Sequence, residues 1–184
     1  MPEIKRQIPL KSTIQFSEGS VLTGVVPVST LVEEYTNLCI YGRNGSGKTT
    51  LACMFEKPLL IISCEPGTNG GAMSVVSIPD VHQIRVTPPY QKIKGDRVHG
   101  SAKVVAIANE LAAKNPFKTV VLDTVTSLQD IILVELMGLP KMPEMLSWGL
   151  VPEGVYRERA EKVREIVRPL LDLGNCNVVI LAQE

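Results

Sequence analysis

The sequence predicts an α/β fold, a mainly parallel sheet flanked by helices. Four apolar, strand-prone segments recur along the chain, separated by helical patterns and loops. They are residues 37–41, 59–64, 119–123 and 177–182. The second is a continuous apolar run, as expected of a parallel strand that is buried on both faces. A glycine-rich loop joins the first segment to a helical one, which is the third observation behind this fold class.

Composition bounds the kind of protein. The chain has 184 residues, of which 45% are hydrophobic, enough for one globular domain with a sizeable core. Lys and Arg total 19, as do Asp and Glu, so net charge gives no overall signal for nucleic acid. Membrane-length apolar runs and a signal peptide are both missing, so we expect a cytoplasmic protein without membrane contact. We expect reduced, buried thiols at Cys39, Cys53, Cys64 and Cys176.

The first 35 residues are predicted to form an N-terminal extension. Residues 13–16 and 21–26 are strand-prone, and the four residues between them suit the turn of a β-hairpin. Pro27 ends the second strand. We therefore divide the chain into a hairpin extension, residues 1–35, and a core domain, residues 36–184.

The core begins with the segment from Gly42 to Thr49, which reads G-x-x-x-x-G-K-T, the Walker A phosphate-binding loop. Its glycines let successive backbone N–H groups point at phosphate oxygens. Lys48 is expected to reach the β- and γ-phosphates, and the Thr49 hydroxyl to ligate Mg²⁺. The residues expected to bind the nucleotide are Gly42, Arg43, Asn44, Gly45, Ser46, Gly47, Lys48, Thr49 and Thr50.

Glu65 directly follows the buried segment 59–64, at the end of the sheet where open α/β folds bind ligands. Phosphoryl transfer to water needs a carboxylate or amide that orients the nucleophile. We therefore expect Glu65 to position the attacking water. The alternative is that Glu65 only begins a turn with Pro66.

Asp123 ends the apolar segment 119–123, which is the Walker B pattern. Its carboxylate is expected to stand beside the Walker A loop and hold Mg²⁺, directly or through water. An Asp in this context is otherwise a helix cap or a turn former. Residues 124–127 follow at once, and we expect them to form hydrogen bonds within the site.

The remaining helices and strands are predicted from the spacing of apolar residues and from the positions of Gly and Pro. A short strand is predicted over residues 81–86, and a helix capped by Ser101 over residues 102–114. Residues 137–154 read as a loop or broken helix that contains Trp148. A helix over residues 155–173 carries interleaved charges of both signs, which favours a solvated face over a DNA contact. Isolated surface residues are expected at His82 and His99; Pro169 should kink the last helix, and Gly174 should end it.

The order of these residues resembles the RecA-like ATPases of the P-loop NTPase class: Walker A, a Glu after the second strand, a Walker B Asp and a Gln after the last strand. The resemblance implies that Glu65 activates the attacking water. It also implies that Gln183, in Ile180-Leu181-Ala182-Gln183, senses the γ-phosphate and relays to DNA-binding loops. Within this class the chain is most similar to phage-encoded nucleotide-binding ATPases of recombination and single-strand annealing.

The resemblance covers residues 36–184 and carries further expectations. It implies ATP and Mg²⁺ as ligands, a ring or filament of like subunits, single-stranded DNA as a partner and the cytoplasm of a bacterial host. RecA-like cores continue past the Gln strand, whereas this chain stops at Glu184. We therefore expect a core truncated after the fourth strand, with the Walker A strand at an exposed edge.

The sequence thus predicts a Mg-dependent module that binds and hydrolyses ATP in a DNA recombination or annealing protein. Single-stranded DNA would contact residues 137–154, where Trp148 could stack on a base. One alternative is a P-loop kinase for a nucleoside-type acceptor, although residues 88–100 hold only Lys92, Lys94 and Arg97 for a basic lid. Another is a non-catalytic, nucleotide-binding assembly subunit.

Overall fold

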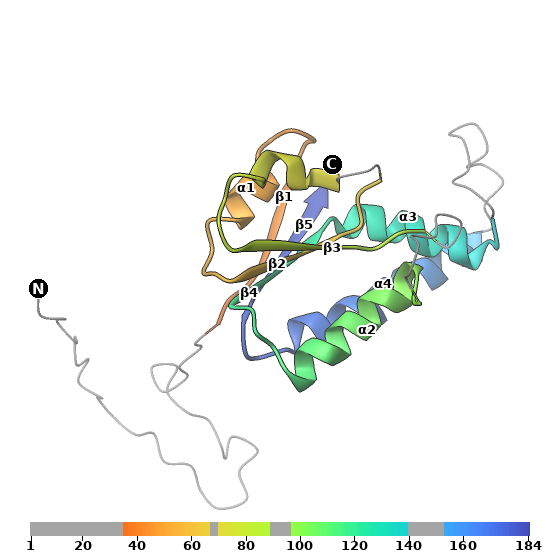
Figure 1. The fold of residues 1–184 in the computed structure, drawn as a ribbon. Helices are drawn as coiled ribbons and strands as arrows, with labels where there is room; N and C mark the ends of the chain where they lie inside the picture. Colours follow the sequence, from red (N-terminus) through yellow and green to blue (C-terminus); the bar gives the residue numbers. More distant parts are fainter. Residues whose placement is uncertain (1–34, 67–69, 89–96, 140–152) are drawn as a thin grey trace, which may run out of the picture. The chain divides into compact units, whose positions relative to one another are not determined.

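A computed structural model describes residues 35–66, 70–88, 97–139 and 153–184, and shows a sheet between two layers of helices (Figure 1). The strands are β1 (Asn37–Gly42), β2 (Leu59–Ser63), β3 (Val81–Arg85), β4 (Thr119–Asp123) and β5 (Asn177–Gln183). The helices are α1 (Lys48–Ala52), the 3₁₀ helix Gly70–Val75, α2 (Gly100–Ala113), α3 (Val125–Leu136) and α4 (Glu153–Leu171). In this part of the chain, none of the helices has the length and apolarity that crossing a bilayer requires.

The described strands form one five-stranded sheet in the order β1-β5-β4-β2-β3, and every neighbouring pair is parallel. The predicted α/β class and parallel sheet are therefore confirmed, and the short strand expected at 81–86 is present as β3. Because all strands run the same way, their carboxyl ends meet at one edge of the sheet. The register places Ser63 beside Asp123, and Gly42 beside Gln183.

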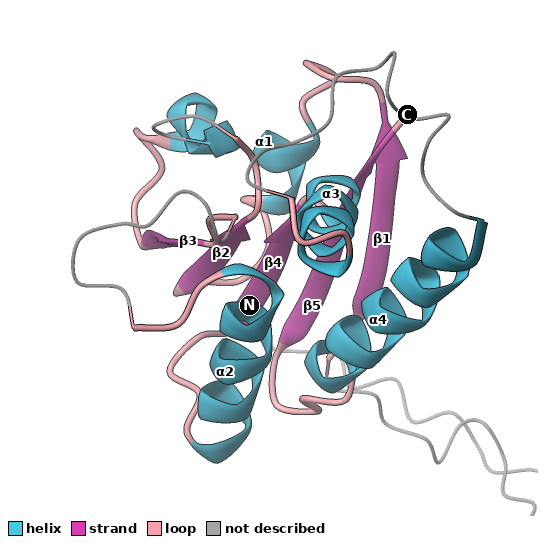
Figure 2. Cartoon of the chain, turned by 90° about the vertical axis from the view of Figure 1, so that its right-hand side faces the viewer, coloured by secondary structure: helices cyan, strands magenta, loops and turns pink. Residues whose placement is uncertain are grey.

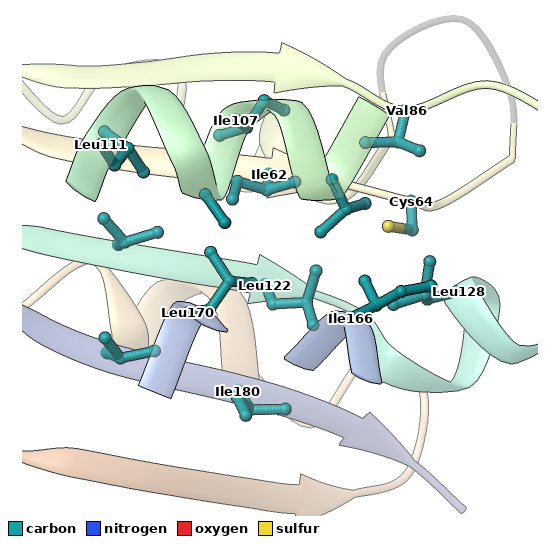
Figure 3. Close-up of a cluster of buried hydrophobic side chains, with 14 of the residues drawn as sticks. Ile62, Cys64, Val86, Ile107, Leu111, Leu122, Leu128, Ile166, Leu170 and Ile180 are labelled. Atoms are coloured by element: carbon teal, nitrogen blue, oxygen red, sulfur yellow. The ribbon is translucent and has the colours of Figure 1, made fainter. Parts of the chain in front are cut away.

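Two apolar clusters cover the two faces of the sheet. The larger one lies under α2, α3 and α4, the face that Figure 2 turns toward the viewer, and Figure 3 shows its packed side chains. The smaller one lies under α1 and the 3₁₀ helix. Side chains alternate along β4, so Leu122 joins the larger cluster and Val121 the smaller one. Asp123, two residues after Val121, therefore shares the face of the sheet that α1 covers.

β1 differs from the other strands of the site in its exposure. Within the described residues it pairs with β5 alone, so one side of its backbone has no neighbouring strand. Leu38 and Tyr41 are 40% and 66% exposed, whereas every residue of β2 and β4 is buried. The position expected for the Walker A strand, at a sheet edge, is confirmed for the part of the chain that is described.

Several local expectations were wrong. Ser101 does not cap α2, because the helix begins at Gly100 after the extended residue His99, and Ser101 instead contacts Glu135 of α3. Cys39 is exposed rather than buried, although all four thiols are free. No helix was predicted where α3 lies. Its signals were the cap at Thr124 and apolar residues at helical spacing, which are Leu128, Ile131, Ile132 and Val134.

Other predictions lie outside the described residues or agree with them. The predicted N-terminal hairpin, and Trp148 with most of its loop, lie outside. α4 runs through Pro169, where the kink stays a prediction, and it ends at Leu171, shortly before Gly174 with φ of 60° in the left-handed region. Mixed charges on α4 form exposed pairs, as expected of a solvated face: Arg157 with Glu161, and Arg168 with Asp172.

Candidate functional site

The Walker A loop connects the end of β1 to the start of α1. Gly45 and Gly47 adopt φ angles of 73° and 83°, a left-handed conformation that residues with a Cβ rarely take. Ser46 N–H donates to the Arg43 carbonyl at 3.2 Å, which tightens the loop. The sequence therefore places glycine at the two positions where this turn requires it.

Lys48, the first residue of α1, turns its side chain back over the loop. Its Nζ donates to the carbonyl oxygens of Gly42 at 2.9 Å and of Arg43 at 2.8 Å. The Arg43 guanidinium points to the end of β5, where Nε donates to Glu184 Oε2 at 3.0 Å. The ammonium group of Lys48 is thus placed at the mouth of the loop, whereas the charge of Arg43 is directed to Glu184.

Thr49 and Asp123 meet across the face that α1 covers. The Thr49 hydroxyl donates to Asp123 Oδ2 at 3.0 Å, although 74 residues separate them in the chain. Burial raises the pKa of Asp123, the hydrogen bond from Thr49 lowers it, the charge of Glu65 raises it, and Lys48 lowers it. A hydroxyl and a carboxylate are oxygen donors of the kind that Mg²⁺ prefers.

This donor pair fits Mg²⁺ only in company with a phosphate. In the described part of the chain, no three or more His, Cys, Asp or Glu residues gather closely enough to hold a metal ion. Mg²⁺ in phosphoryl-transfer sites is held by one or two protein oxygens, by water and by phosphate oxygens. The fit with Thr49 and Asp123 is therefore to a metal ion that arrives with a nucleotide.

Glu65, just past the end of β2, is held by hydroxyl groups from the first turn of α3. Its Oε1 accepts a hydrogen bond from Thr124 Oγ1 at 3.1 Å and another from Ser127 Oγ at 3.2 Å. Thr124 Oγ1 also accepts from Ser127 N–H at 3.1 Å, which caps α3. The expectation that residues 124–127 form hydrogen bonds within the site is confirmed.

Gln183 ends β5 and is fixed by its backbone. Its N–H donates to Thr126 Oγ1 at 2.9 Å, and the Thr126 hydroxyl donates to the Gln183 carbonyl at 3.3 Å. Gln183 also lines the cavity described below. Three strand ends, those of β2, β4 and β5, therefore supply Glu65, Asp123 and Gln183 to one place.

A cavity of about 330 Å³ unites these groups. It brings together seven residues of the loop and α1 with the three strand-end residues that the sequence singled out. Ser74, in the 3₁₀ helix, also lines it and was not predicted, because no motif surrounds it. The lining residues are Asn44, Gly45, Ser46, Gly47, Lys48, Thr49, Thr50, Glu65, Ser74, Asp123, Thr124 and Gln183.

A second cavity of about 460 Å³ adjoins the first, because Asn44, Glu65 and Gln183 line both. α3 forms one of its walls through Ser127, Asp130 and a short apolar stretch. Burial raises the pKa of Asp130, while the charge of Arg159 lowers it and that of Glu65 raises it. Glu65 therefore stands between the phosphate-binding loop and a second space large enough for a small molecule.

Comparison with known proteins places this arrangement in a family. A model described as an AAA domain matches residues 34–184, which include every described strand, helix and site residue. No curated protein matches the chain. The phosphate-binding loop, the parallel sheet and this match agree, and the chain belongs to the AAA domain family, a group of P-loop ATPase-like domains.

Proposed function

We propose that this domain binds ATP together with Mg²⁺ and hydrolyses it. The observation that carries the proposal is the single 330 Å³ cavity, in which a phosphate-binding loop, an oxygen donor pair and a further carboxylate lie together. The loop and Lys48 suit the phosphates, Thr49 and Asp123 suit the metal, and Glu65 suits a water molecule. Glu65 is the residue that supports hydrolysis over nucleotide binding alone.

Binding begins with an exchange of partners at Lys48. Its ammonium group contacts two carbonyl oxygens of the loop, and phosphate oxygens would replace them as stronger, charged acceptors. Backbone N–H groups of the loop and the start of α1 add donors around the same oxygens. Mg²⁺, held by Thr49 and Asp123, would neutralise part of the phosphate charge when bound.

Hydrolysis follows from the position of Glu65. Among the described residues, both hydrogen bonds to its carboxylate are accepted by Oε1, which leaves Oε2 to orient a water molecule. The water oxygen forms a bond to the γ-phosphorus, the bond from that phosphorus to the bridging oxygen breaks, and Glu65 accepts the proton. The products are ADP and inorganic phosphate. Gln183, at the end of β5, lines the same cavity and is the residue proposed to contact the γ-phosphate.

We further propose that the ATPase acts in DNA recombination or single-strand annealing, in a ring or filament of like subunits. The support is the order Walker A, Glu65, Asp123 and Gln183, together with the Gln183 backbone contacts to α3. Single-stranded DNA is the proposed effector, and the cytoplasm of a bacterial host is the proposed location. The segment proposed to contact DNA, 137–154, lies mostly outside the described residues.

A second candidate function is phosphoryl transfer to a small nucleoside-type acceptor. The second cavity, of about 460 Å³, favours this function, because Glu65 and Gln183 line both it and the first cavity. An acceptor hydroxyl in that space would replace water as the nucleophile, and Glu65 would take its proton. The two functions differ in product: a phosphorylated acceptor in one, inorganic phosphate in the other.

The test compares ATP turnover by wild type, Lys48→Ala and Glu65→Gln, with and without single-stranded DNA. We expect both variants to lose turnover by at least about 100-fold, while Glu65→Gln still binds ATP. Glu158→Gln, which makes the same change on the exposed face of α4, is the control and should match wild type. Equal turnover in Glu65→Gln and wild type would contradict the proposed role of Glu65. Phosphate appearing on an added nucleoside would favour the kinase.

A further inference from the structure

The N-cap and first turn of α3 carry three hydroxyl side chains, at Thr124, Thr126 and Ser127, and all three reach other elements of the site. We propose that Thr124 and Ser127 are positioning residues, which hold the Glu65 carboxylate by one oxygen so that the other faces the phosphate cavity. The inference rests on the proposed function, in which Glu65 orients the attacking water.

Two donors that converge on one oxygen fix a carboxylate better than one. Glu65 Oε1 lies 3.1 Å from Thr124 Oγ1 and 3.2 Å from Ser127 Oγ, and the two hydroxyl oxygens are 3.1 Å apart. A single hydrogen bond would let the carboxylate swing about it. Bonds from two separate side chains restrict that rotation and define the direction of Oε2.

The donors are themselves held in place. The Thr124 hydroxyl can donate to Glu65 while it accepts from Ser127 N–H at 3.1 Å, so the helix cap orients it. Thr124 is 3% exposed, which excludes most competing water. Thr126, between the two donors, is tied to the Gln183 backbone in both directions, at 2.9 Å and 3.3 Å. The turn is therefore anchored to β5, and through its hydroxyl groups it controls a residue that follows β2.

Charge gives the hydroxyl groups a second role. Asp123 and Asp130 both lie close enough to Glu65 for its charge to raise their pKa values. Glu65 therefore stands among like charges, and repulsion would turn a loosely held carboxylate toward solvent. Hydrogen bonds to an ionised acceptor are stronger than those to a neutral one, so two hydroxyl donors offset that repulsion.

Ser127 offers the cleaner test, because Thr124 also caps α3. We expect Ser127→Ala to lower kcat for ATP hydrolysis about tenfold or more while KM for ATP changes by less than about twofold. Ser127→Thr keeps a hydroxyl at the same place and should restore most of the rate. A purely structural role would not give this split between kcat and KM, nor this rescue.

Ser101→Ala is the matched control. Ser101 donates to the Glu135 carboxylate at 2.5 Å, so this variant also removes a serine-to-glutamate hydrogen bond that involves α3, but away from the cavity. It should lower the unfolding temperature and leave kcat close to that of wild type. Equal losses of kcat in Ser101→Ala and Ser127→Ala would overturn the positioning role, because the loss would then follow from a weakened α3.

The double variant Ser127→Ala, Glu65→Gln shows whether Ser127 acts through Glu65. We expect its residual rate to equal that of Glu65→Gln alone, since the donor then has no carboxylate to position. A further tenfold loss would overturn the inference, and so would an unchanged kcat in Ser127→Ala. If Glu65→Gln itself turns over like wild type, the proposed function fails first, and the two failures are distinguishable.

Discussion

Two strands whose ends contribute to the candidate site, β4 and β1, differ in burial. β4 lies between β2 and β5, all five of its residues are buried, and it ends in Asp123. β1 has one neighbour among the described strands and is largely exposed, and the phosphate-binding loop leaves from its end. Asp123, the proposed metal ligand, is therefore built into the most constrained part of the sheet, whereas the Walker A loop leaves from an edge strand.

The contacts that hold β1 reflect this difference. Polar bonds, rather than apolar packing on both faces, tie its ends to the rest of the domain. Thr36 N–H donates to Asn177 Oδ1 at 2.9 Å, and Asn37 Nδ2 donates to the Leu171 carbonyl at 3.0 Å. At the other end Arg43 reaches Glu184. The bonds of Asn37 and Arg43 are exposed and therefore individually weak, so the loop end of β1 should be easier to displace than Asp123.

Truncation of one leucine in each strand gives the largest expected contrast. Leu122 of β4 is fully buried, so Leu122→Ala should lower the free energy of unfolding by about 3 kcal/mol. Leu38 of β1 is 40% exposed, so Leu38→Ala should cost less than about 1 kcal/mol. Urea denaturation of both variants checks this. Equal losses would mean that β1 is as tightly packed as β4, which would contradict the difference in burial between the two strands.

The next effect concerns the metal. Asp123→Asn keeps an oxygen that can accept from Thr49 but removes the charge that we propose attracts Mg²⁺. We expect ATP affinity in the presence of Mg²⁺ to fall by at least about tenfold, and affinity in EDTA to change little. Isothermal titration under both conditions measures it. An equal loss with and without Mg²⁺ would indicate that Asp123 supports the loop rather than the metal.

Asp123→Asn should also have a smaller effect on stability: without nucleotide, the substitution should stabilise the protein although it weakens ATP binding. Because burial raises the Asp123 pKa above 3.8, the folded protein holds this proton more tightly than the unfolded chain does. The contribution of Asp123 to stability is therefore lost as pH rises from about 4 through its raised pKa, and ionised Asp123 costs stability at neutral pH. Without nucleotide, Asp123→Asn should unfold at a higher temperature than wild type at pH 7.5. The advantage should shrink toward pH 4.5, and a pH-independent difference would refute it.

Arg43→Ala should have the smallest effect. The pair with Glu184 is exposed at the surface, with the Arg43 side chain 84% accessible, so its loss should cost about 0.5 kcal/mol or less. The loss should vanish in high salt. Thermal unfolding of wild type and variant at low and high ionic strength measures both points. A loss of more than about 1 kcal/mol would show that this pair, rather than the backbone of the loop, holds the end of β1.

Much of the fold followed from local pattern. The expected strands agree with the observed ones to within one residue at each end, because apolar runs bounded by turn residues leave little freedom in their limits. α3 was missed although its cap and its apolar spacing are local signals, whereas the misassigned cap of α2 has a partner that is distant in the chain. Glu135 contacts the start of α2 from 34 residues away, and a pattern read along the chain carries no information about such a partner.

The site was predictable where it depends on spacing. Glycine spacing located the loop, and the parallel arrangement implied that Asp123 would meet Thr49. Thr49 Oγ1 donates to Asp123 Oδ2 at 3.0 Å. The sequence did not reveal that Glu65 is held by two hydroxyls, that Ser74 lines the first cavity, or that a second cavity adjoins Glu65. These features depend on side-chain direction and on the packing of α3, which the sequence reading had not identified.

The central claim is that the loop from Gly42 to Thr49 binds a triphosphate, and calorimetry tests it most directly. Titration of ATP with Mg²⁺ into wild type should give saturable heat at one site. Lys48→Ala, which removes the ammonium group but leaves the glycines of the loop, should give none at the same concentrations. Absence of heat with folded wild type, or equal heat with both proteins, would contradict the account.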